Sequence, residues 1–183
     1  MMLISGGAPA PDAPVLRTGG VPLVPRGFNW PTCAECEGAM QFLAHVPVDG
    51  GAVAVFYCQN DPGMCDDWNA TSGGNQAFLF TGELHAAAAP TEGQTLLGAV
   101  TSLLPDDTVA PDGDGVLGQL SGEPEWIQND ETPTCPSCAD PMKFMVSLEE
   151  GLHHTTAANF GGSGRGYVFT CQCCSEAAFL WQC

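Results

Sequence analysis

The chain has 183 residues, of which 44% are apolar, so it is long enough and apolar enough to fold, and a disordered chain is excluded. Only 4 Lys and Arg stand against 21 Asp and Glu, and the resulting charge of −17 argues against a protein that binds the phosphates of nucleic acids. With 23 glycines and 15 prolines, the composition favours short strands and turns over helices.

The first segment, residues 1–14, starts with a short apolar stretch and then turns to Gly, Ala and Pro. It lacks the basic start and the apolar run of a secretion signal, and no later apolar run is long enough to span a bilayer. We therefore expect a flexible N-terminus and a cytoplasmic protein that does not bind membranes. Because the cytosol keeps thiols reduced, metal binding explains the 10 cysteines better than disulfides do.

Residues 15–82 are expected to form the first of two zinc-binding β repeats. A Gly-Val-Pro turn precedes Cys33-x-x-Cys36, and a strand is predicted from Met40 to about residue 46. A run of β-branched and aromatic residues predicts a second strand that ends at Cys58, and the apolar residues 77–80 predict a closing strand.

Residues 83–118 are expected to form an acidic connector that is rich in Gly and Pro. Its densest part, residues 106–115, has the composition of a flexible linker. The stretch from Leu96 to Leu104 is the only candidate for a helical turn in the chain.

Residues 119–183 are expected to form the second zinc-binding β repeat, because they match the first half at a constant offset of 102 positions. The matched pairs are Pro22 and Pro124, Pro31 and Pro133, Cys33 and Cys135, Cys36 and Cys138, Met40 and Met142, and Phe42 and Phe144. A strand that ends at Cys171 and a closing strand at 178–181 follow in the same order. The sequence predicts a mainly β fold of two pseudo-repeat antiparallel β halves, each with a zinc-ribbon-like knuckle of four cysteines.

Each half supplies a Cys-x-x-Cys turn and a later pair of cysteines, which is the pattern of a tetrahedral zinc site. The predicted ligands are Cys33, Cys36, Cys58 and Cys65 for the first ion, and Cys135, Cys138, Cys171 and Cys174 for the second. Cys173 or Cys183 could replace Cys174, which is preferred because Cys171-x-x-Cys174 is a standard spacing. A redox pair is the alternative for a Cys-x-x-Cys motif, but no thioredoxin-like pattern of strands and helices surrounds either motif.

Four thiolates fill the coordination sphere of zinc, so both Zn²⁺ ions are predicted to be structural rather than catalytic. Trp30 and Trp126 precede the two Cys-x-x-Cys turns and are expected to pack over the knuckles, with contact to a partner as the alternative. The competing hypothesis is an enzyme with a site between the halves. It would use the polar residues of one segment, which are Glu149, Glu150, His153 and His154. Ordinary loop histidines are the simpler interpretation of that segment.

The acidic charge and the saturated sites lead to a functional hypothesis. We expect a non-catalytic, zinc-stabilised protein-binding module whose acidic surface meets a basic protein partner, in the manner of a chaperone or of an immunity protein. An acidic surface that serves solubility alone is the simpler alternative.

Several motifs together resemble one known family. In the first half they are Gly19-Gly20-Val21-Pro22, Phe28-Asn29-Trp30-Pro31 and Met40-Gln41-Phe42-Leu43-Ala44. In the second half they are Gly122 to Gln128, Asp130, Cys135 to Met142, and Gly166-Tyr167-Val168-Phe169 through Trp181-Gln182. With these motifs the chain resembles the YwqG-like family of uncharacterised bacterial proteins over most of its length, apart from the start and the connector. This resemblance implies a duplicated β-rich fold and no particular activity.

The first half also resembles the programmed cell death 2 family in its Gly-Gly-x-Pro motif, its Cys-x-x-Cys turn and the run Phe56-Tyr57-Cys58. That resemblance implies an acidic zinc protein that holds a basic client. His45 stands where relatives often have Gln, which puts any role of that Gln in doubt.

Overall fold

The computed structural model describes residues 1–90, 98–151 and 158–183, and all regular elements within these ranges are β-strands. The strands are β1 (Met2–Ser5), β2 (Arg17–Thr18), β3 (Leu23–Val24), β4 (Gln41–Val48), β5 (Gly51–Tyr57), β6 (Asn75–Thr81), β7 (His85–Ala86), β8 (Thr101–Asp106), β9 (Val116–Leu120), β10 (Lys143–Glu149), β11 (Arg165–Cys171) and β12 (Glu176–Gln182). The predicted mainly β fold is confirmed.

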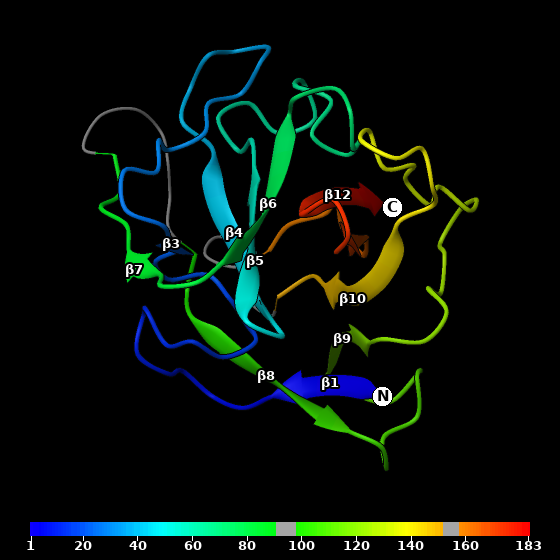
Figure 1. Cartoon of the computed structure of the whole chain (residues 1–183). Helices are drawn as coiled ribbons and strands as arrows, with labels where there is room; N and C mark the ends of the chain where they lie inside the picture. Colours follow the sequence, from blue (N-terminus) through cyan, green and yellow to red (C-terminus); the bar gives the residue numbers. More distant parts are fainter. Residues whose placement is uncertain (91–97, 152–157) are drawn as a thin grey trace.

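One antiparallel sheet contains ten of the strands that the structure describes, in the order β12-β11-β10-β9-β1-β8-β2-β4-β5-β6, while β3 and β7 form a separate pair. The outermost strands, β6 and β12, lie against each other, so the sheet curls into a nearly closed barrel (Figure 1). Close to this seam the backbone N–H of Trp181 donates a hydrogen bond to the carbonyl oxygen of Trp68, at 3.1 Å. Curling protects the edges that an open sheet would expose.

The two halves are meanders of three strands, β4-β5-β6 and β10-β11-β12, and they share their irregularities as well as their order. A bulge interrupts the pairing between Phe42 and Ala44 in the first half and between Phe144 and Val146 in the second. Bulges are specific local features, and these two recur at the offset of 102 that the sequence shows. The predicted pair of pseudo-repeat antiparallel halves is therefore confirmed.

Both faces of the middle strand of each half are covered. In β5, Val53, Val55 and Tyr57 point to the core that the halves share, whereas Ala54 and Phe56 point outward to a smaller cluster that contains cysteines. A strand that is buried on both faces loses the usual alternation of apolar and polar residues. This is why residues 52–57 read as a continuous apolar run.

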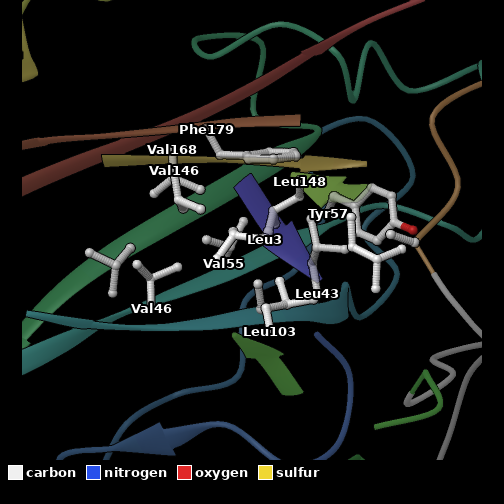
Figure 2. Close-up of a cluster of buried hydrophobic side chains, with 14 of the residues drawn as sticks. Leu3, Leu43, Val46, Val55, Tyr57, Leu103, Val146, Leu148, Val168 and Phe179 are labelled. Atoms are coloured by element: carbon white, nitrogen blue, oxygen red, sulfur yellow. The ribbon is translucent and has the colours of Figure 1, made fainter. Parts of the chain in front are cut away.

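The shared core lies inside the barrel, where residues of both halves meet (Figure 2). The ring of Tyr57 in the first half lies 6.2 Å from that of Phe160 and 6.5 Å from that of Phe179, both in the second. Leu3 of β1 is completely buried in the same cluster. The two halves are thus joined by one hydrophobic core.

The expectation of a flexible N-terminus is wrong for residues 2–5. They form β1, which pairs with β8 on one side and β9 on the other, close to the middle of the sheet. A run of four residues is too short to show a period in the sequence, and pairing with partners more than 90 residues away decides its structure.

The connector also differs from the expected flexible linker. It contributes β8 and the first three residues of β9 to the sheet, and residues 101–104, which were expected in a helical turn, belong to β8. Residues 96 and 97 of that expected turn lie outside the described residues. The acidic cluster of Gly and Pro between β8 and β9 is a surface loop, as its composition indicates.

A buried arginine in β2 fixes the backbone of residues 13–21 and lies against β4. The Arg17 guanidinium lies 5.4 Å from the centre of the Phe42 ring and donates hydrogen bonds to the carbonyl oxygens of Ala13, Gly19 and Val21. Burial lowers the pKa of Arg17 to about 10, so the side chain still carries its charge at neutral pH. This cation holds the backbone together and is not available on the surface.

Candidate metal centres

The first group of cysteines comes from three separate segments. Cys33 and Cys36 lie on a turn that a backbone bridge closes, Cys58 follows the last residue of β5, and Cys65 lies in the loop of residues 59–74. Their four sulfur atoms all lie within 4.8 Å of one another. The Sγ atoms of Cys36 and Cys58 are 3.7 Å apart.

The second group is built in the same way from Cys135, Cys138, Cys171 and Cys174. Cys171 is the last residue of β11, and Cys174 lies in the short turn to β12. The four sulfur atoms again lie within 4.8 Å of one another, and the Sγ atoms of Cys138 and Cys171 are 3.7 Å apart. The structure thus brings together each set of four that the spacing predicted.

These distances agree with a tetrahedral metal ion. A bond of about 2.3 Å from zinc to sulfur requires neighbouring sulfurs of a regular tetrahedron to be about 3.8 Å apart. The two pairs at 3.7 Å match that edge. Each group is therefore suited to hold one metal ion, in a site that leaves no position open for water.

A shared backbone feature follows the second cysteine of each pair. The residues directly after Cys36, Cys65, Cys138 and Cys174 are Glu37, Asp66, Ala139 and Ser175, and they have φ angles of 59°, 47°, 63° and 55°. This left-handed conformation is uncommon for residues other than glycine, and here it closes the turn around the sulfur. The recurrence after Cys174 favours Cys174 over Cys173 as the fourth donor.

Backbone N–H groups support the exposed sulfurs. The N–H of Gly38 donates to the sulfur of Cys36, and the N–H of Asp140 donates to the sulfur of Cys138. These two donors are again related by the offset of 102. Hydrogen bonds of this kind stabilise a thiolate and orient it toward a metal.

The protonation behaviour of the first group favours a bound cation. The hydrogen bond from Gly38 is the main cause that lowers the pKa of Cys36 to about 7. Burial and then the neighbouring sulfurs of Cys58 and Cys33 raise the pKa of Cys65. Four clustered thiolates repel one another, so the group can ionise fully only when a metal cation compensates their charge.

Aromatic residues cover both groups, as the sequence predicted. The indole N–H of Trp30 donates to the carbonyl oxygen of Met40 at 2.8 Å, and its ring meets the Phe56 ring at 5.3 Å. Trp126 packs on Tyr167, with ring centres 4.6 Å apart, beside the second group. Each knuckle, its tryptophan and the outer face of its strands form a small hydrophobic cluster, separate from the shared core.

The residues of the alternative enzymatic hypothesis are only partly described. His153 and His154 lie outside the described residues. Glu149 accepts a hydrogen bond from Arg165 at 2.6 Å, and Glu150 accepts backbone N–H groups of Phe160 and Gly162, both at 2.7 Å. Glu149 thus links β10 to β11, and Glu150 holds the backbone of residues 160–162.

Sequence reasoning missed a buried carboxylate at the seam between the halves. Asp67 is 1% exposed and accepts a hydrogen bond from the indole N–H of Trp181 at 3.3 Å, and the Trp181 ring meets the Trp68 ring edge to face. Burial raises the pKa of Asp67. Nothing in the Asp66-Asp67 pair distinguishes the exposed residue from the buried one, so the sequence carried no signal for this contact.

Within the described ranges, the structure contains no helix that is both long and apolar enough to cross a membrane. No family model matches the chain. The chain is similar to an uncharacterised protein, YpfL, of Salmonella typhimurium (strain LT2), with 37% identity over 67 residues. The aligned part is 36% of this chain and 15% of that protein, so the chain spans much less than two thirds of its relative. The name of that relative states no activity, and the functional argument therefore depends on the cysteine groups and the surface around them.

Proposed function

We propose that this protein is a non-catalytic, zinc-stabilised module that binds a basic protein partner on an acidic surface. The observation that carries the proposal is the pair of four-cysteine groups, each with its sulfurs within 4.8 Å, in a chain with a charge of −17. Zinc is the metal that best suits four thiolates in a closed tetrahedron, since it has no preference for further ligands in such a site. A closed site supports the fold and leaves no metal-bound water for catalysis.

The proposed role of zinc is to stabilise the outer clusters. Each cluster is small, and its cysteines replace the additional apolar residues that a larger core would contain. Structural zinc contributes on the order of 10 kcal/mol or more to the folding of small domains. That contribution is comparable to the whole stability of an ordinary domain, which is about 5–15 kcal/mol.

Few cations oppose the surface carboxylates, because one of the four is buried and another is already paired with carboxylates. Arg17 is completely buried, and Arg165 forms ion pairs with Glu149 and Glu125, at 2.6 and 3.5 Å. Only Arg26 and Lys143 remain exposed to oppose the surface carboxylates. A field of this sign attracts basic proteins and repels nucleic acids.

The loop of residues 59–74 is the best candidate for the contact with the partner. Met64 is 69% exposed and Trp68 is 40% exposed, and the exposed carboxylates of Asp61 and Asp66 lie in the same loop. Large apolar side chains that are surrounded by charge are typical of the central residues of protein interfaces. Cys65 ties this loop to the first metal group, so the proposed zinc ion also fixes the contact surface.

A pocket of about 350 Å³ adjoins this loop and extends to the second half. Trp68 and Ala70 line one side, and Pro133, Leu180 and the carboxylate-bearing Glu131 line the other. The pocket suits a long side chain with an apolar stem and a positive end, which is the chemistry of Lys and Arg. The resemblance to the programmed cell death 2 family supports a client-holding role of this kind, whereas an immunity protein would use the same surface to cover a basic toxin.

The experiment combines metal analysis with capture of partners. Purified, reduced protein is expected to contain two zinc ions per chain, which elemental analysis measures. The immobilised protein is then exposed to cell lysate at low and at high salt, and captured proteins are identified. We expect a partner rich in Lys and Arg that is retained at low salt and lost at high salt.

A matched pair of variants tests the proposed surface. Exchanging Asp61 and Asp66 for Asn should weaken capture, while the same exchange at Asp112 and Asp114, in the exposed loop before β9, should have little effect. Equal weakening by both pairs would refute the proposed contact surface. Absence of any partner at low salt, or capture of acidic proteins only, would refute the protein-binding function.

A further inference from the structure

The second metal group has an additional cysteine beside it that the first group lacks. Cys173 is a fifth cysteine beside the second group, and its thiol is exposed. Its Sγ atom lies 3.2 Å from that of Cys171 and 3.6 Å from that of Cys174. The second group is also the more accessible one, because Cys174 is partly exposed whereas the corresponding Cys65 is buried.

The equivalent position of the first group has a protective residue. Asn60 follows Cys58 by two positions, as Cys173 follows Cys171. The Asn60 side-chain amide donates to the sulfurs of Cys36 and Cys58, both at 3.5 Å. An N–H donor withdraws electron density from a thiolate and makes it less reactive, whereas a neighbouring thiol offers a second sulfur with which to react.

We propose that Cys173 is an oxidation site through which peroxides open the second metal centre while the first stays closed. The proposal rests on the proposed function, because it requires zinc in both groups. Exposed thiols next to a second cysteine are typical of reversible redox sites. Oxidation would loosen the outer cluster around Trp126 and leave the 59–74 loop fixed by the first ion.

The chemistry needs a peroxide as its oxidant. The Cys173 sulfur attacks the peroxide, an S–O bond forms, the O–O bond breaks, and the alcohol or water that leaves carries the proton of the thiol. The Cys171 thiolate then attacks the sulfur of the resulting sulfenic acid. The S–S bond forms, the S–O bond breaks, and hydroxide leaves and takes a proton from solvent. Two electrons pass from the two sulfurs to the peroxide, and the metal loses one of its four ligands.

Cys171 is the expected partner rather than Cys174. Its sulfur is the closer of the two to that of Cys173. Cys173 and Cys174 are neighbours in the chain, and the ~3.8 Å between Cα atoms across a trans peptide is shorter than a normal disulfide accepts. A thiol reductant would break the bond between Cys171 and Cys173 and restore the site.

The test follows zinc release from the intact protein after addition of hydrogen peroxide, with a chromogenic chelator as the probe and mass spectrometry to locate the disulfide. Wild-type protein should release one ion in a fast phase, together with a bond between Cys171 and Cys173. Cys173→Ser and Cys173→Asn should slow that phase by about tenfold or more, because the exposed nucleophile is absent. Cys183→Ser removes an exposed thiol elsewhere in the chain and should leave the phase unchanged.

A reciprocal variant uses the duplication as its control. Asn60→Cys gives the first group a fifth thiol, so this variant should release the ion of the first group almost as fast as the ion of the second group. The proposal is overturned if the fast phase persists in Cys173→Ser, or if both ions of the wild type leave in one phase. It is also overturned if Cys173→Ser holds one ion and Cys174→Ser holds two, since Cys173 would then be a ligand.

Zinc content before oxidation separates this inference from the proposed function. Protein that contains no zinc refutes the proposed function. Protein that contains two ions but shows no dependence on Cys173 refutes only the oxidation site.

Discussion

Replacing Leu3 with alanine tests the part of the fold that the sequence did not reveal. Leu3 lies in β1, which connects β8 to β9 near the middle of the sheet, and its side chain is completely buried in the core that both halves share. If β1 holds the two meanders together, shortening this side chain should destabilise the whole protein rather than fray its end.

The magnitude follows from the surroundings of the side chain. Leucine to alanine exchanges in buried positions cost about 2–5 kcal/mol, and the cost is highest where neighbours cannot move into the cavity. The backbone of β1 is paired on both sides, so we expect the upper part of this range. For a chain of this size, each kcal/mol lowers the melting temperature by about 2–4 °C, which predicts a fall on the order of 10 °C.

Thermal unfolding of the zinc-loaded protein, followed by circular dichroism, measures this effect. Leu104→Ala is the matched control, because it makes the same exchange in the neighbouring strand β8, where Leu104 is 52% exposed. Its melting temperature should stay within about 2 °C of the wild type, as expected for a surface change of ±0.5 kcal/mol. If Leu3→Ala and Leu104→Ala melt at the same temperature, the N-terminal segment does not belong to the core and the reasoning fails.

Three further predictions address the metal centres, a carboxylate and the seam. Cys33→Ser and Cys135→Ser should each reduce the zinc content by one ion. A strong chelator should unfold the wild type cooperatively, which circular dichroism would show. A protein that keeps its full structure without metal would contradict this prediction. Although burial opposes its ionisation, backbone N–H groups lower the pKa of Glu150, so Glu150→Gln should cost about 1–2 kcal/mol at pH 7. Because the folded-state pKa is the lower one, this advantage is fully present at pH 7, above the unfolded value. Urea titrations of the zinc-loaded wild type and variant at pH 7 check it, and a difference within about 0.5 kcal/mol, as for an ordinary surface change, would refute the assignment. Trp181→Phe removes the hydrogen bond to buried Asp67 and should lower the free energy of unfolding in urea by about 1–3 kcal/mol. The loss in the double variant Trp181→Phe/Asp67→Asn should differ from the sum of the two single losses. If the losses simply add, the contact contributes nothing to stability.

The sequence was most informative where spacing and repetition constrain the chain. The offset of 102 predicted the two halves, and the cysteine spacing predicted both groups of four sulfurs. Thiolate ligands need a short turn and a second pair nearby, so their spacing in the chain reports their geometry in space. The runs before Cys58 and Cys171 predicted strands for a similar reason, since β-branched and aromatic residues fit a pleated surface.

The tertiary structure decided what depends on contacts between distant segments. The four residues of β1 and the five of β9 become strands because each pairs with strands from other parts of the chain. Segments this short show no hydrophobic periodicity from which a strand could be predicted. The burial of Arg17 and Asp67 follows in the same way from what surrounds them, not from their neighbours in the chain. The amino-acid sequence therefore determined the local units and their metal ligands, whose chemistry acts over a few residues, while the closing of those units around one core came from long-range pairing and packing.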